Sequence, residues 1–188
     1  MSAGIMHSHV THRWGTPDTD DFPMVSLCRE LMGGVIDLDP ASESVFNEVV
    51  KATRYYSSPE RGEDGLVLPW YGRVLLNPPG EEKGKPRQNF IPRFWRKAIT
   101  EDIEQCCYVG FAMDQLNILA NEEAHPTDFS IVYLRNRLPF RRHDWVPGMK
   151  DAPAKANFIV GLNVDHKKFV ELFSPYGKVQ AGPLARDA

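Results

Sequence analysis

The stretch Arg73-Val74-Leu75-Leu76-Asn77-Pro78-Pro79-Gly80 combines a short apolar run with an abrupt end. The run of Val74, Leu75 and Leu76 is typical of a strand buried on both faces of a parallel sheet. Pro78 and Pro79 have no backbone N–H, so the chain must leave the sheet there. The stretch therefore predicts an α/β fold with Asn77 at the carboxyl end of a strand, where open α/β sheets bind their ligands.

The loop after this strand is rich in hydrogen-bond acceptors and poor in donors. A stiff backbone holds the carbonyl oxygens of Asn77 and Pro78 and the Asn77 carboxamide. Two acceptors that form hydrogen bonds with the two hydrogens of a nucleobase amine favour a more tetrahedral nitrogen, with its lone pair exposed to an electrophile. The simpler alternative is a proline-rich turn, because short motifs also arise by chance.

Length and composition are those of one globular domain. The chain has 188 residues, of which 42% are hydrophobic and 25% charged. We expect residues 1–13 to be a flexible tail and residues 14–188 to form a single domain. No apolar run approaches membrane-spanning length, and no signal-peptide core is visible.

The cysteine and histidine patterns fit no metal site or disulfide framework. Cys28, Cys106 and Cys107 are odd in number and two are adjacent, so we expect core thiols in a reducing cytoplasm. His7, His9 and His12 have no carboxylate or cysteine nearby, which favours a mobile tail over a metal centre.

Charge is distributed unevenly along the chain. Residues 1–64 carry 5 basic and 11 acidic side chains, a balance of −6, whereas residues 65–188 carry 17 and 14, a balance of +3. Two basic clusters with interleaved aromatic residues could hold phosphates, although a solvated helix face explains the first cluster equally well. The first cluster comprises Lys83, Lys85, Arg87, Arg93, Arg96 and Lys97, and the second Arg135, Arg137, Arg141 and Arg142.

Hydrophobic periodicity predicts strands that alternate with helices, without an internal repeat or linker. We expect a turn at residues 14–17, a long basic loop at 135–155, an antiparallel pair of C-terminal strands and an irregular tail from Ser174. Helices are expected at 22–32, between Ser42 and Val50, at 90–103, at 115–124 and after Asp165. Strands are expected at 35–40, 53–56, 73–76, 106–112, 129–134 and 157–162.

An acidic turn follows the first predicted parallel strand. It carries Asp37 and Asp39 and no Gly-x-Gly-x-x-Gly, which argues against a dinucleotide, whose pyrophosphate needs backbone N–H groups. The two carboxylates suit a ligand with a cationic amino group and a hydroxylated ribose. The alternative is that Asp37 or Asp39 is only a capping residue at the protein surface.

Several spaced motifs occur in a characteristic order. They are Trp14, Thr16 and Pro17 as Trp-x-Thr-Pro, Asp-x-Asp-Pro-Ala-Ser at 37–42, Asp64-Gly65-Leu66, Trp70, and Asn77-Pro78-Pro79. Over roughly residues 14–165 this order resembles the phage-type DNA N-6-adenine methyltransferases, a Dam-like family of short phage and prophage enzymes. The resemblance implies a compact Rossmann-like methyltransferase fold, mostly parallel, that uses S-adenosylmethionine.

The resemblance also implies roles for individual residues. Asn77, Pro78 and Pro79 would be catalytic, with Asn77 and Pro78 binding the amine of an adenine flipped out of double-stranded DNA. Residues implied to bind the cofactor are Trp14, Thr16, Pro17, Asp37, Asp39, Pro40, Ala41, Asp64 and Leu66. Candidate substrate contacts are Gly80, Lys83, Lys85, Arg87, Phe90, Arg137 and Arg141.

The chain departs from the family pattern in two ways. Gly80 stands where the family ordinarily has an aromatic residue that stacks on the flipped base, so Tyr71, Phe90, Phe94 or Trp95 must stack instead or base binding is weakened. Only 37 residues separate Asp39 from Asn77, which implies a compact or trimmed sheet. A separate target-recognition domain is also missing, so specificity would be low or carried by loops 80–89 and 135–155.

Four functions are compatible with these observations. The leading expectation is a cytoplasmic phage or prophage enzyme that methylates adenine in DNA and protects it from restriction. A cytosine-N4 methyltransferase would use the same acceptor geometry. The third candidate is a catalytically lapsed fold that binds DNA or a protein, and the fourth is a methyltransferase for small molecules or proteins.

Overall fold

The computed structural model describes residues 14–15, 18–19, 22–57, 61–79, 90–142 and 155–187. In these residues a seven-stranded mixed sheet has the strand order β3-β2-β4-β5-β8-β6-β9. Its strands are β2 (Leu38–Asp39), β3 (Arg54–Tyr55), β4 (Arg73–Leu76), β5 (Gln105–Gly110), β6 (Ser130–Leu134), β8 (Phe158–Leu162) and β9 (Gly177–Ala181). The helices are α1 (Met24–Leu31), α2 (Ser44–Val50), α3 (Phe90–Thr100), α4 (Asp114–Ile118) and α5 (His166–Phe173).

The sheet has a parallel half and an antiparallel half. Strands β3, β2, β4 and β5 are parallel neighbours. Beyond them, β5 pairs with β8, β8 with β6, and β6 with β9, all antiparallel. The expected antiparallel pair of C-terminal strands is therefore confirmed as β6 and β8, whereas the mostly parallel character holds for the first four strands only.

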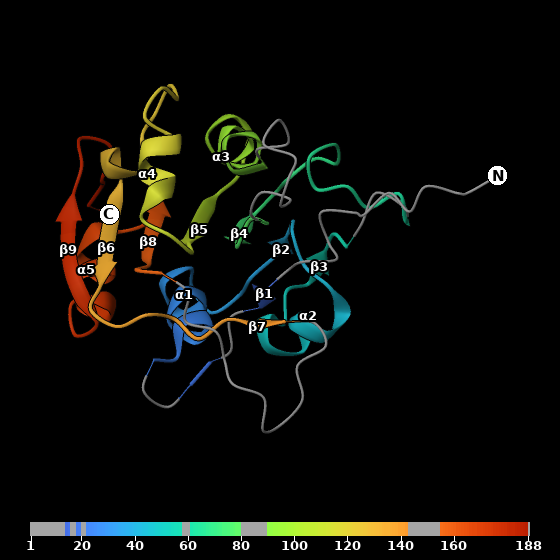
Figure 1. Cartoon of the computed structure of the whole chain (residues 1–188), viewed down its shortest axis with the longest axis horizontal. Coiled ribbons are helices and arrows are strands. Elements are labelled where there is room, and N and C mark those ends of the chain that lie inside the picture. Colours follow the sequence, from blue (N-terminus) through green and yellow to red (C-terminus); the bar gives the residue numbers. More distant parts are fainter. Residues whose placement is uncertain are drawn as a thin grey trace.

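Helices cover both faces of the sheet (Figure 1). The core on one face joins α3 to Val74 and Leu76 of β4, and the core on the other face joins α1 and α5 to Leu75. Val74, Leu75 and Leu76 are at most 2% exposed, as predicted for a strand buried on both sides. The apolar run has no polar face because it lies between two helix layers.

The order of the strands reverses at β2. The chain passes from β2 through α2 to β3 on one side and then returns to β4 on the other side. In open α/β sheets the crevice at such a switch point, outside the carboxyl ends of the strands, is the usual ligand site. Between β2 and β4 the described residues contain only α2 and β3 as helix and strand, which agrees with the short interval between Asp39 and Asn77, while the sheet as a whole has seven strands.

Two local predictions are wrong because long-range pairing overrides them. Trp14 and Gly15, predicted in a turn, form β1 (Trp14–Gly15), which pairs antiparallel with β7 (Arg141–Arg142) inside the predicted basic loop. The tail after Ser174, predicted to be irregular, contains the edge strand β9, which pairs with β6. Neither pairing partner is visible in the local sequence.

The ends of two helices follow their sequence signals. Helix α1 stops before Gly33 and Gly34, whose φ angles of 80° and 94° lie in the left-handed region that favours glycine. The side chain of Asp165 accepts a hydrogen bond from the backbone N–H of Lys168 at 2.6 Å and so caps α5. Both ends agree with the prediction.

An ion pair ties β2 to the start of β4. Asp37 Oδ2 accepts hydrogen bonds from the backbone N–H of Arg73 at 2.9 Å and from Arg73 Nε at 2.8 Å. Gly72 permits this approach, because a Cβ there would lie 2.6 Å from Asp37 Oδ2. The hydrogen bond from the Arg73 side chain, aided by its charge, lowers the pKa of the Asp37 carboxyl.

We expect Asp37→Asn to lower the free energy of unfolding at neutral pH by about 1.5–3 kcal/mol, the usual range for a hydrogen bond to a charged group. A carboxyl whose pKa is lowered in the folded state stabilises that state above its unfolded pKa of about 4, and the stabilisation is lost as the pH falls through the folded pKa. The difference between wild type and variant should therefore shrink below pH ~4.

Urea unfolding at several pH values measures this difference. Asp187→Asn is the matched control, because its partner Lys167 lies 3.3 Å away in an exposed pair that should contribute little. A difference between wild type and Asp37→Asn that stays constant from pH 7 to pH 3 would contradict the role of the charge.

Candidate functional site

Asn77, Pro78 and Pro79 follow β4 directly at its carboxyl end. Pro78 and Pro79 are buried, and Asn77 is half-buried. Phe90, the first residue of α3, is 6% exposed and belongs to the same core as Leu76. The start of α3 therefore packs on the face of the sheet that carries Leu76.

The loop at residues 39–41 emerges at the same edge of the sheet. Strands β2 and β4 are parallel neighbours with Leu38 opposite Val74, so residues that follow them leave the sheet side by side. The Asp39 side chain is 4% exposed, and its Oδ1 accepts the backbone N–H of Ala41 at 3.1 Å. The structure thus brings the two predicted loops together.

Asp39 and Asn77 share one face of this edge. Leu38 packs on the face covered by α3, whereas Leu75 packs on the face covered by α1. Because side chains alternate along a strand, Asp39 falls on the same face as Leu75, and continuing the alternation puts Asn77 there too. A buried carboxylate and a carboxamide with an adjoining carbonyl are thereby set on neighbouring strand ends.

A third predicted segment, residues 64–66, packs against the loop after β2. Gly65 lies so close to Pro40 that a Cβ would come within 1.9 Å of the Pro40 carbonyl oxygen. Trp70 Nε1 donates to the Gly65 carbonyl oxygen at 2.7 Å, and Asp64 Oδ1 accepts from the backbone N–H of Leu66 at 2.9 Å. These contacts hold Asp64 and Leu66 beside the β2 loop.

Asp37 is not brought to this edge. Its carboxylate binds Arg73 at the beginning of β4, the end of that strand opposite to Asn77. The structure therefore gives Asp37 a role in joining β2 to β4, and Asp39 is the acidic residue of the turn that lies at the switch point.

The structure describes only some of the other residues predicted to contact the cofactor or the substrate. Trp14 pairs through its backbone with Arg142, and Arg141 with Gly15, so the structure joins a predicted cofactor segment to a predicted substrate segment. Six residues predicted to bind the cofactor or the substrate lie outside the part of the chain that the structure describes: Thr16, Pro17, Gly80, Lys83, Lys85 and Arg87.

The two basic clusters differ in how their charges are used. In the first cluster, Arg96 Nε lies 2.6 Å from Glu122 Oε2 and Lys97 Nζ lies 2.6 Å from Glu101 Oε1. In the second cluster, Arg135 and Arg137 are exposed. Strands β6 and β5 both run antiparallel to β8 and so point the same way, which sets Arg135 and Arg137 at the edge that carries Asn77.

Asn157 is a buried polar residue at this edge of the sheet whose role the sequence did not reveal. Its side chain is 1% exposed, Oδ1 accepts the backbone N–H of Leu138 at 2.7 Å, and Nδ2 donates to the Gly110 carbonyl oxygen at 3.4 Å. It thereby fastens the segment that carries Arg137 to the end of β5. The only signal was an asparagine before an apolar run, which is also common in turns.

Gln115 is a second residue that the sequence did not single out. It belongs to α4, the helix directly after β5, and its side chain is 1% exposed. Its Oε1 accepts a hydrogen bond from the Tyr108 hydroxyl at 2.7 Å. A buried amide of α4 is therefore bound to Tyr108 of β5, the strand next to β4.

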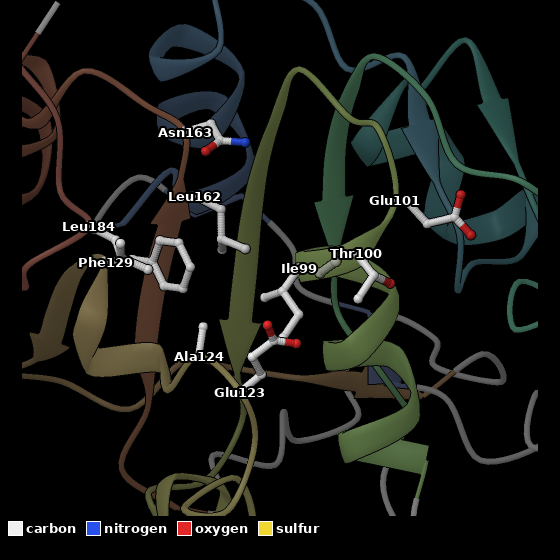
Figure 2. A pocket seen from close by; sticks show the side chains of 10 residues that line it. Ile99, Thr100, Glu101, Glu123, Ala124, Phe129, Leu162, Asn163 and Leu184 are labelled. Atoms are coloured by element: carbon white, nitrogen blue, oxygen red, sulfur yellow. The ribbon is translucent and has the colours of Figure 1, made fainter.

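A separate hollow of about 510 Å³ opens at the opposite edge of the sheet (Figure 2). Ile99, Phe129 and Leu162 form apolar parts of its lining, and Glu123 contributes a carboxylate. Leu162 is paired with Cys106 near the beginning of β5, far along that strand from its carboxyl end. The hollow is therefore distinct from the predicted site.

Two further searches concern the described residues alone. No group of three or more His, Cys, Asp or Glu side chains in them could hold a metal ion. None of the helices within the described ranges has the length and apolarity needed to cross a membrane.

Together, these observations define an α/β protein with a candidate ligand site at the switch point of its sheet, built from residues 39–41, 64–66 and 77–79. Comparison with models of known protein families, with curated proteins and with solved structures finds no match for this chain.

We expect Gly65→Ala to destabilise the protein and to disturb the loop after β2, because the added Cβ would meet the Pro40 backbone. Overpacking of this kind typically costs about 1–3 kcal/mol. Gly62→Ala is the control: its Cβ would meet nothing within 4 Å, so it should show only the strain of a φ of 70°. Thermal unfolding of both variants measures the difference, and equal losses would contradict the close contact.

Proposed function

We propose that this protein is an S-adenosylmethionine-dependent methyltransferase that acts on the exocyclic amine of adenine in double-stranded DNA. The observation that carries the proposal is the convergence of the loops at 39–41 and 77–79 on neighbouring carboxyl ends at the switch point. In this view the sheet is a trimmed Rossmann-like methyltransferase sheet, and the enzyme is a phage or prophage protein that protects DNA from restriction in the host cytoplasm.

The chemistry of the side chains at the edge suits this cofactor. When bound, S-adenosylmethionine supplies an electrophilic methyl group carried on a sulfonium. The Asp39 carboxylate is suited to the ammonium group of its methionine part, and residues 64–66, held against Pro40, are suited to its adenine end. No pyrophosphate-binding glycine pattern competes with this assignment.

Asn77 and Pro78 act on the target amine in this proposal. The Asn77 side-chain oxygen and the Pro78 carbonyl oxygen accept the two amine hydrogens, which directs the nitrogen lone pair toward the methyl group. Because both prolines are buried and lack an N–H, the loop offers no competing backbone donor at those two positions. Positioning is the main contribution of the protein, and the base must be flipped out of the duplex to reach the loop.

DNA is favoured over a small acceptor by the charge at the same edge. Arg135 and Arg137 are exposed beyond β6, on the edge that carries Asn77. Exposed arginines at the edge of the sheet that carries a flipped-base site can bind DNA phosphates.

The decisive test uses purified protein, S-adenosylmethionine with a labelled methyl group, and unmethylated DNA that is afterwards digested to nucleosides for mass spectrometry. Labelled N6-methyladenine supports the proposal. Label on cytosine keeps the mechanism and changes the base. Absence of label in protein that binds the cofactor by calorimetry would indicate a lapsed methyltransferase fold that only binds.

We expect Asn77→Ala to reduce methyl transfer by on the order of 10²-fold or more, because one of the two acceptors for the amine is lost. Its affinity for S-adenosylmethionine should stay within a few-fold of wild type, since Asn77 contacts the target. Asn117→Ala, an exposed position on α4, is the matched control. Unchanged turnover in Asn77→Ala would remove Asn77 from the mechanism.

We expect Asp39→Asn to weaken cofactor binding by about 5- to 150-fold, which corresponds to the loss of ~1–3 kcal/mol from a charge-assisted contact. Asparagine retains an oxygen that can accept the Ala41 N–H, so the turn should survive. Isothermal titration calorimetry measures the affinity, with Asp102→Asn, exposed beyond α3, as control. Equal affinities in both variants would refute the assignment of this loop.

A further inference from the structure

Strand β9 forms the edge of the sheet on its antiparallel side (Figure 1). It pairs with β6 through a continuous register, from Ser130 opposite Ala181 to Leu134 opposite Gly177, and no other strand in the described ranges pairs with its outer side. An open edge exposes N–H and C=O groups that can pair with another chain, and proteins usually protect it with proline, a bulge or an inward-pointing charge. Residues 177–181 contain no proline, and their register with β6 contains no bulge.

The hydrogen bonds at the two ends of β9 show which of its residues face outward. The backbone N–H of Arg135 donates to the Tyr176 carbonyl oxygen at 2.9 Å, and the N–H of Gly182 donates to the Phe129 carbonyl oxygen at 3.0 Å. Bonded and non-bonded pairs alternate along an antiparallel ladder, so the even-numbered residues of β9 bond to β6. The odd-numbered residues therefore direct their N–H and C=O groups away from the sheet.

These outward groups are arranged symmetrically about Val179. They belong to Gly177, Val179 and Ala181, the odd-numbered residues of the strand. A two-fold axis at Val179 sets this residue opposite its own copy and Gly177 opposite Ala181, so that every outward N–H meets an outward C=O. An axis at Lys178 or at Gln180 would leave one of the three residues in each copy without a partner in β9.

The side chains favour the same register. Lys178 is the charged residue of β9, and an axis at Val179 sets it opposite Gln180 of the second copy, whose amide oxygen can accept from the ammonium group. An axis at Lys178 would set two lysines directly opposite each other, which is destabilising. Val179 packs against the core that α1 and α5 cover, so the two valines extend this core from one copy to the next.

The C-terminal tail turns away from the outer edge of β9. The backbone N–H of Leu184 donates to the Asp128 carbonyl oxygen at 2.6 Å, and the N–H of His166 donates to the Arg186 carbonyl oxygen at 2.7 Å. Asp128 precedes β6, and His166 begins α5 after β8. Because β6 and β8 lie on the inner side of β9, the described part of the tail leaves the outer edge open.

We propose that the protein forms a two-fold dimer in which the β9 strands of two copies pair antiparallel, centred on Val179. The partner at this edge is a second copy of the chain, and the two seven-stranded sheets join into one continuous sheet. The same surface of both copies is used, as in other isologous interfaces. The candidate ligand site lies at β2 and β4, away from β9 in the strand order, so this proposal is independent of the proposed function.

Sedimentation velocity over protein concentrations from micromolar to millimolar tests the dimer with Val179→Pro. The wild type should change from monomer to dimer as its concentration rises. Proline is tolerated at an edge position whose N–H bonds to no other strand of the same chain, so the variant should fold. Its dimer dissociation constant should rise by about 5- to 150-fold, because the hydrogen bond that each copy donates at the centre is lost.

Gln180→Pro is the matched control for the alternation of the ladder. It removes an N–H on the side of β9 that faces Ile131 of β6, so it should lower the thermal midpoint of the dilute monomer, whereas Val179→Pro should leave it close to wild type. Ala181→Pro, at the exposed end of the strand, is the second variant should Val179→Pro not fold. It removes another outward N–H and should also weaken the dimer.

Gln180→Glu tests the register by strengthening the dimer. It sets a carboxylate opposite Lys178 of the second copy, and the two pairs per dimer should lower the dissociation constant by about 2- to 30-fold. Thr53→Glu adds the same charge beside β3, at the other edge of the sheet, and should leave the constant unchanged. A wild type that stays monomeric throughout the series, or a dissociation constant that neither the proline variants nor Gln180→Glu alter, would overturn the proposal.

Discussion

The parallel pairing of β2 with β4 is the constraint on which the candidate site depends. With Leu38 opposite Val74, the residues after the two strands leave the sheet at one edge, and the Asp37–Arg73 ion pair fastens the other end of the same pair. Helices on both faces then bury Val74, Leu75 and Leu76 and fix the strand ends in place. A change in register would separate the two loops and send their side chains to different faces.

Around this pair, close contacts and buried polar residues set the rest of the edge. The absence of a side chain at Gly65 lets residues 64–66 lie against Pro40. Asn157 joins the end of β5 to the segment that leads from β6, and Gln115 joins α4 to Tyr108. Buried polar groups of this kind specify a unique arrangement when they are satisfied, and one left unpaired calls for a physical explanation.

Local signals predicted much of the parallel half of the fold. Apolar runs bounded by Gly, Pro or Asp located β4, α1 and α5 with their ends, because these signals act within a few residues of the chain. They failed at Trp14-Gly15 and in the tail after Ser174, which became strands by pairing with β7 and β6. Strand formation there depends on a distant partner, which no local pattern encodes.

By itself, the amino-acid sequence determined the buried strand that ends at Asn77-Pro78-Pro79, the acidic turn at Asp39 and the acceptor-rich chemistry of both, because these follow from residue types within a short stretch. Only the tertiary structure decided that Asp39 lies at the edge while Asp37 binds Arg73, that Arg137 shares this edge, and that Gln115 keeps one donor unpaired. These depend on strand order and packing between residues far apart in the chain, where every contact is set by the whole fold.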